Sequence, residues 1–134
     1  MRISTKGRYG LVIMIYLAKE YESGRFVSLK EISENEEISL KYLEKIMLNF
    51  KDTDFFVSSR GAEGGYKLAY SPDKYKLKDI FEKLEGNVEI VSCLNKDVPC
   101  KKKNKCISFS LWKDINDLID EYLAQKTLED LIKR

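Results

Sequence analysis

Two helix-forming segments, each with a serine at its start, follow one another in this chain. Ser28 can cap the first segment, and Glu31, three residues later, completes the pattern of a capping box. Ser39 can cap the second segment. The apolar residues of this second segment recur at helical spacing: Leu40, Leu43, Ile46, Met47 and Phe50. The short polar link between them, residues 35–37, has room only for a tight turn, so the sequence predicts a helix-turn-helix.

The residues that follow predict a β-hairpin. Residues 55–59 and 66–70 are rich in aromatic and β-branched types, and the glycine-rich residues 60–65 separate them. A helix-turn-helix followed by a hairpin makes a winged helix-turn-helix, a fold whose second helix enters the major groove of DNA. We therefore expect this fold and a nucleic-acid partner.

A long amphipathic segment near the end of the chain predicts a dimerisation helix over residues 108–125. Its apolar residues lie at nearly heptad spacing along one seam: Leu111, Ile115, Leu118 and Tyr122, with Trp112 and Ile119 beside them. Such a seam usually faces another helix, and so short a chain has no obvious partner for it. We therefore expect a homodimer. Thr127 and Asp130 can cap a final short helix.

Two further helices complete the predicted fold. Ser4 or Thr5 can start the first, and Gly86 can end the second. Their apolar stripes are Leu11, Met14, Ile15 and Ala18 in the first, and Leu77, Ile80, Phe81 and Leu84 in the second. The fold class is mainly α with a small β-hairpin. We predict a DNA-binding domain at residues 1–86, a cysteine-containing sensor loop at 87–107, and the dimerisation helix with a C-terminal tail at 108–134.

The composition, with 43% hydrophobic and 34% charged residues, is typical of a globular protein. The apolar residues 11–18 are too few to cross a membrane, and no small-residue cleavage site follows them. We expect a cytoplasmic protein without a membrane partner. There is no phosphate loop, no dinucleotide fingerprint and no histidine to act as an imidazole base, so an enzyme is not expected.

The exposed face of the second helix in the helix-turn-helix carries residue types that can contact DNA. If the apolar residues point inward, the outward residues near its start are Ser39, Lys41, Tyr42, Glu44 and Lys45. Lysine and tyrosine can contact phosphates or guanine, and glutamate can accept from cytosine N4. The alternative is an ordinary solvated helix face.

The hairpin tip is rich in glycine, so its backbone can approach DNA closely. Ser59, Arg60 and Gly61 begin it, and Arg60 is the candidate for insertion into the minor groove. A plain hairpin whose glycines serve only the turn is the alternative. Glu63, also at the tip, would repel phosphate.

Three cysteines, Cys93, Cys100 and Cys106, lie close together, and a disulfide between any two leaves one unpaired. Thiolates bind iron-sulfur clusters and zinc, and the lysines around these residues would favour thiolates. The sequence therefore predicts a metal or iron-sulfur site. Zinc, a thiol-disulfide switch and unliganded thiols in a loop are the alternatives.

Several short motifs lie around these features along nearly the whole chain. They are MRIS at residues 1–4, KGRY at 6–9, ISLKYLE at 38–44, SRG at 59–61, GGY at 64–66, LEG at 84–86 and LW at 111–112. In this order and with the cysteine loop, they resemble the IscR, NsrR and CymR group of winged-helix regulators, the Rrf-two family.

The resemblance implies a homodimer crossed through its long C-terminal helices, with each wing and recognition helix reading half of a two-fold operator in double-stranded DNA. It implies that Cys93, Cys100 and Cys106 hold a [2Fe–2S] or [4Fe–4S] cluster that senses cluster supply, nitric oxide or redox state. It further implies that Glu44 contributes to sequence choice and that Arg60 enters the minor groove. A cluster-free regulator controlled by a partner protein, zinc or thiol oxidation is the alternative.

The cysteine loop departs from the family pattern. Six residues separate the first two cysteines and five separate the last two, whereas IscR-like loops usually have five in each gap. The histidine ligand of IscR-like proteins would fall at Phe109, and the cross-subunit aspartate of NsrR-like proteins at Arg8. The fourth ligand is therefore unidentified; Asp97, Ser108, a carboxylate of the partner subunit, an outside thiol and water are candidates.

Overall fold

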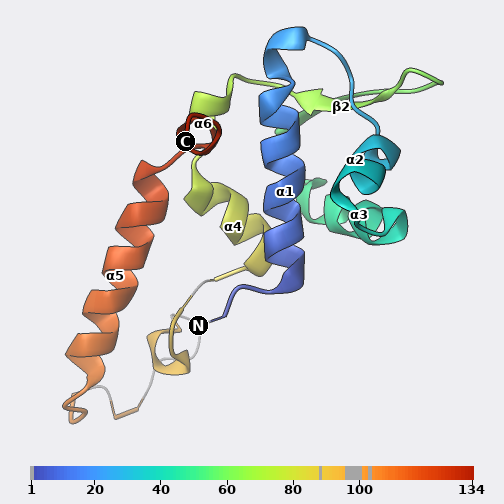
Figure 1. Cartoon of the computed structure of the whole chain (residues 1–134). Coiled ribbons are helices and arrows are strands. Elements are labelled where there is room, and N and C mark those ends of the chain that lie inside the picture. Colours follow the sequence, from blue (N-terminus) through green and yellow to red (C-terminus); the bar gives the residue numbers. More distant parts are fainter. Residues whose placement is uncertain (1, 88, 96–100, 103) are drawn as a thin grey trace.

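The computed structural model describes residues 2–87, 89–95, 101–102 and 104–134, and its fold is mainly helical with one hairpin, as predicted (Figure 1). The α-helices are α1 (Thr5–Lys19), α2 (Leu29–Glu36), α3 (Leu40–Met47), α4 (Leu77–Glu85), α5 (Phe109–Gln125) and α6 (Leu128–Ile132). The strands are β1 (Phe56–Ser59) and β2 (Gly65–Leu68). Short 3-10 helices are η1 (Tyr21–Ser23), η2 (Leu48–Phe50), η3 (Pro72–Lys74) and η4 (Ser92–Leu94).

Side-chain caps start the helices where the sequence predicts them. Ser4 accepts from the amide of Gly7 at 3.0 Å, and Ser28 accepts from the amide of Glu31 at 3.0 Å. Ser39 caps α3 in the same way, and Thr127 with Asp130 forms a full capping box at α6. Such caps satisfy amides that have no partner inside the helix. The Glu31 carboxylate does not bond back to Ser28 as a capping box requires, because Arg25 and Tyr16 bind it instead.

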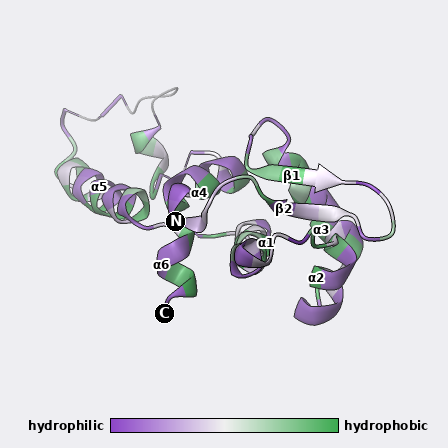
Figure 2. Ribbon diagram, turned by 90° about the horizontal axis from the view of Figure 1, so that it is seen from above, coloured by the Kyte–Doolittle hydropathy of each residue, from purple (hydrophilic) through white to green (hydrophobic). Residues whose placement is uncertain are grey.

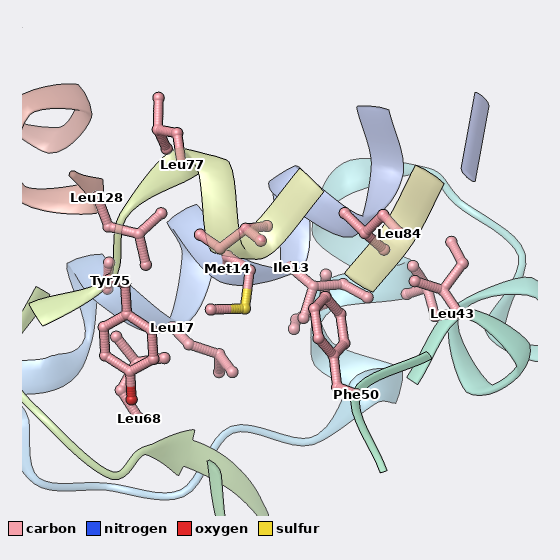
Figure 3. Close-up of a cluster of buried hydrophobic side chains, with 14 of the residues drawn as sticks. Ile13, Met14, Leu17, Leu43, Phe50, Leu68, Tyr75, Leu77, Leu84 and Leu128 are labelled. Atoms are coloured by element: carbon pink, nitrogen blue, oxygen red, sulfur yellow. The ribbon is translucent and has the colours of Figure 1, made fainter. Parts of the chain in front are cut away.

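The hydrophobic core surrounds α1, which lies between α4 and α6 on one side and α2 and α3 on the other (Figure 1). Figure 3 shows the side chains that meet there, and the fully buried ones include Ile13, Met14, Leu17, Leu43, Leu84 and Leu128. Gly10 allows α1 and α4 to pack closely, since a Cβ at this position would lie 2.4 Å from a methyl group of Leu84. The core thus fixes α3 relative to the rest of the chain.

The hairpin is tied to the helical body through Val27. β1 and β2 pair in antiparallel register, Phe56 with Leu68 and Ser59 with Gly65. On the other side of β2, the amides of Val27 and Tyr66 each donate to the other's carbonyl at 2.8 Å. Gly65 must lack a side chain, because its φ is +149° and a Cβ would lie 2.2 Å from the Val27 carbonyl oxygen.

The strand limits differ slightly from the sequence prediction. β1 begins one residue later than expected, and β2 begins at Gly65 and ends at Leu68 instead of continuing to Tyr70. Pairing reaches one step further, where the Ala69 amide donates to the Phe55 carbonyl at 2.9 Å. The chain then turns into η3, where Pro72 has no amide to continue a strand.

α5 projects from the body on the side opposite the hairpin (Figures 1 and 2). After α5 the chain returns to the core. Leu128 of α6 is fully buried there, and its amide donates to the Tyr75 carbonyl at 3.0 Å. The Leu77 amide also donates to the Lys126 carbonyl at 2.9 Å. The C-terminal residues after α5 therefore pack with the helices of the predicted DNA-binding domain. Among the described residues, no helix is long and apolar enough to span a bilayer.

Candidate nucleic-acid interface and cysteine site

The outer face of α3 is open to solvent. Leu43 and Ile46 are buried in the core, and four of the five residues predicted to point outward are exposed: Ser39, Lys41, Glu44 and Lys45. Tyr42 is half-buried, with its ring edge-on to Tyr9 at a centroid distance of 5.8 Å. Part of the Tyr42 side chain is therefore used in packing α3 against α1.

The turn before α3 sets its direction. α2 includes residues 35 and 36, which the sequence predicts in the link, and Glu37 caps its end with a left-handed φ of 55°. Asn35 remains helical while its side chain donates to the Tyr16 hydroxyl at 2.9 Å and to the Glu31 carbonyl at 3.0 Å. Ile38 is buried immediately after the turn. The two helices of the motif are thereby held to α1.

The hairpin of β1 and β2, with its turn at residues 60–64, is the wing of the fold. Ser59, Arg60 and Gly61 are exposed at the start of this turn. Glycine is required here, since φ at Gly61 is +104° and a Cβ on Gly64 would lie 2.3 Å from the Ser59 carbonyl oxygen. Within residues 2–87, no carboxylate forms an ion pair with Arg60. Its guanidinium is thus free to meet an outside anion.

One open groove of about 320 Å³ joins α3 to the wing. Glu44 lines it from α3 and Ser58 lines it from β1, and Met47, Leu48 and Phe56 supply apolar walls. The structure therefore brings the exposed face of α3 and the base of the wing to one surface, although they are separated in the sequence.

A polar network beside this surface was not predicted from the sequence. Arg25 binds the Glu31 carboxylate through two hydrogen bonds of 2.8 Å each, and the Tyr16 hydroxyl donates to the same carboxylate at 2.7 Å. The hydrogen bonds from Arg25, with that from Tyr16, lower the pKa of Glu31 to about 2. Arg25 lies in a loop, so no helical spacing indicates its pairing with Glu31.

Two of the three cysteines lie within the described residues, at either end of the segment between α4 and α5. Cys93 is half-buried in η4, and Cys106 is exposed just before α5. The Cys106 sulfur lies 3.3 Å from the Ser108 hydroxyl oxygen, and this hydrogen bond is the main cause that lowers the pKa of the thiol. Cys100 and Asp97 lie outside the described residues. Among residues that are described, no three histidine, cysteine or acidic side chains form a metal-binding group.

The start of the cysteine segment is attached to α5. The Ile90 amide donates to the Asn116 side-chain oxygen at 3.2 Å, and Lys78 of α4 forms an ion pair with Asp120 at 3.4 Å. These contacts link α4, residues around Ile90 and α5 into one unit.

The model of the Rrf2 family, described as an iron-dependent transcriptional regulator, matches residues 3–134. The chain belongs to the Rrf2 family. CymR of Bacillus subtilis, an HTH-type transcriptional regulator, is 42% identical over 131 residues, which are 98% of this chain and 89% of that protein.

Two solved structures of similar regulators have the same fold. The structure of CymR, described as the global cysteine regulator of B. subtilis, has a TM-score of 0.80 at 40% identity and covers 98% of this chain and 95% of that one. IscR of T. potens has a TM-score of 0.77 at 33% identity, covering 99% and 87%. This Rrf2 protein is a DNA-binding transcription regulator of the CymR and IscR type, and its relatives are regulators, a class that is generally not enzymatic.

Proposed function

We propose that this regulator binds double-stranded operator DNA as a homodimer, with α3 in the major groove and the wing in the adjacent minor groove. The observation that carries the proposal is the shared groove between α3 and β1, lined by Glu44 and Ser58. It joins the exposed face of α3 to the base of the hairpin, as docking of the two elements to consecutive DNA grooves requires.

The residues of this surface have different roles in the proposal. Lys41 and Lys45 neutralise phosphates, while Glu44 selects bases by accepting from cytosine N4. Arg60 enters the minor groove, where its positive charge meets a strong negative potential. Contacts to the sugar-phosphate backbone come from the hydroxyls and amides of Ser39, Tyr42, Ser59 and Gly61.

The proposed homodimer is formed through α5. Three of its four seam residues keep half or more of their surface exposed: Leu111 (51%), Leu118 (66%) and Tyr122 (51%). A second copy of the helix would cover this seam and remove apolar surface from water. The two reading surfaces of a symmetric dimer would then match a two-fold operator.

We further propose that Cys93, Cys100 and Cys106 hold an iron-sulfur cluster, [2Fe–2S] or [4Fe–4S], that controls DNA binding. The donor chemistry fits, because thiolates are the preferred ligands of such clusters and the chain has no histidine. The family's description as iron-dependent supports the same choice. A bound cluster would supply a redox-sensitive centre next to the base of α5.

Ser108 is the best-placed described candidate for the fourth ligand, since its hydroxyl contacts the Cys106 sulfur. A cluster-free regulator controlled by a partner protein, zinc or thiol oxidation is the second candidate. The likeness to CymR favours this candidate, because CymR is described as a cysteine regulator. The identity to CymR is 42%, whereas the identity to IscR of Pectobacterium carotovorum is 31%.

Anaerobic purification followed by iron and sulfide analysis tests the cluster. The expected result is coloured protein with iron and acid-labile sulfide, both lost in Cys93→Ser, Cys100→Ser and Cys106→Ser. DNA affinity or sequence choice should change with cluster loss. Colourless protein with stoichiometric zinc after anaerobic reconstitution would support the second candidate and rule out the first.

A further inference from the structure

Leu48 is a large apolar side chain on the outer face of the helix-turn-helix. It has 65% of its surface exposed, more than any other large hydrophobic side chain within residues 2–87. We propose that Leu48 contacts the C5-methyl group of a thymine in the operator and thereby contributes to sequence choice. This inference rests on the DNA docking proposed above.

The position of Leu48 on its helix supports this role. α3 continues past Met47 into η2, so Leu48 lies one turn after Glu44 and two turns after Lys41. Residues at these spacings share a helix face. The buried residues Leu43 and Ile46 occupy the opposite face. Leu48 is therefore directed with the polar reading residues and away from the core.

The residues around Leu48 form an apolar surface next to the exposed face of α3 that is proposed to contact DNA bases. Met47 and Phe56 line the same groove as Leu48, and Glu44 and Ser58 line it as well. A methyl group that lies near Glu44 in this groove would therefore contact Leu48 and its apolar neighbours.

Thymine supplies the one apolar group that DNA bases present in the major groove, their C5-methyl. Leucine has no donor for a phosphate, so Leu48 should add to the discrimination between sequences without adding to the salt dependence of binding. Lys41, two turns earlier on the same face, should add to the salt dependence of binding without adding to the discrimination between sequences. This difference separates base reading by Leu48 from a general effect on affinity.

The test uses a duplex enriched from a random-sequence library by the purified protein. Each thymine in one half-site is replaced in turn by deoxyuridine, which removes only the methyl group. The wild type should bind about fourfold more weakly at one position, since burying a group of this size contributes about 0.8 kcal/mol. Leu48→Ala should lose about the same factor on the thymine duplex and be indifferent to deoxyuridine at that position.

Val57→Ala is the matched control, because Val57 is also an exposed apolar residue (42%) but does not line the groove. It should respond to deoxyuridine as the wild type does. The slope of affinity against salt should be unchanged in Leu48→Ala and reduced in Lys41→Ala.

Two results would overturn the inference while leaving DNA binding intact. In one, Leu48→Ala responds to every deoxyuridine as the wild type does. In the other, the enriched site has no thymine in either half. A wild-type protein that enriches no sequence at all would contradict the proposed function itself, and the inference would fall with it.

Discussion

The two terminal guanidinium nitrogens of Arg25 donate hydrogen bonds to the two carboxylate oxygens of Glu31, each at 2.8 Å. Its Nε donates to Glu20 at 3.0 Å, and the Tyr16 hydroxyl donates to Glu31 at 2.7 Å. Two residues after Arg25, Val27 pairs with β2. The pair therefore joins α1 and α2 to the segment that holds the wing.

Glu31→Gln should lower the free energy of unfolding by roughly 1 kcal/mol, because the amide keeps the size of the side chain but loses the charge that Arg25 binds. Urea denaturation followed by circular dichroism measures the change. Glu34→Gln on the same helix is the control, since within residues 2–87 Glu34 forms no ion pair. Equal loss in both variants would contradict a specific role for the pair.

Acid stability should depend on the same carboxylate. Its pKa is lowered from 4.5 to about 2 in the folded chain, chiefly by the hydrogen bonds from Arg25. The unfolded chain therefore binds a proton at Glu31 at higher pH than the folded chain, and stability is lost as the pH falls from about 4.5 to about 2. Glu31→Gln should show a shallower decline over this range in denaturation measured at a series of pH values.

Gly65→Ala should weaken both folding and operator binding. The new methyl group would lie 2.2 Å from the Val27 carbonyl oxygen, so the bridge that positions β2 must shift. Gly24→Ala is the matched control: its φ of +69° is also unfavourable for alanine, but no atom lies within 4 Å of the new Cβ. Denaturation and DNA titration should both show the larger loss for Gly65→Ala, and equal losses would argue against a role of the bridge.

Arg60→Ala should weaken operator binding by roughly 1–3 kcal/mol, the cost typical of a base-reading arginine. Lys41→Ala should weaken binding to all sequences and reduce the salt dependence, whereas Glu44→Ala should mainly broaden sequence choice. Fluorescence anisotropy with the enriched duplex and single-base variants measures these effects. Unchanged affinity and preference in all three variants would contradict the docking.

Leu118→Lys should give a folded monomer, because Leu118 is 66% exposed and a charge on the seam opposes its burial by a second copy. Light scattering at micromolar concentration should show half the mass of the wild type. Glu121→Lys places the same residue on an exposed site of α5 outside the seam and should remain dimeric. A wild-type monomer with full operator affinity would contradict the dimer.

Local patterns predicted the helices well, since each has a cap or a periodic apolar stripe in its own sequence. Ser39 and the Thr127–Asp130 box are examples. The features that local patterns did not predict depend on contacts between distant segments. The single-residue bridge at Val27 has no strand pattern, and the return of α6 to the core depends on Leu128 meeting residues around Tyr75.

The candidate site was predicted to a similar extent. Helical spacing placed Ser39, Lys41, Glu44 and Lys45 outside, but it could not show that Tyr42 packs against Tyr9, because α1 is far away in the sequence. The outward residues predicted from helical spacing all lie between Ser39 and Lys45. The exposure of Leu48 has no sequence signal, because an apolar residue near a helix end is ordinarily assigned to the core.

The chain leaves the core after α4 and returns to it at Leu128, so α5 belongs to an excursion between two parts of one core. Lys76 at the start of α4 and Thr127 before α6 are bridge partners, so the excursion re-enters where α4 begins. Within the excursion, Leu123 of α5 packs against the same core, and Asp120 pairs with Lys78 of α4. Because both ends of the excursion meet beside one core, residues between α4 and α5 can be added or removed without moving α3 or the hairpin.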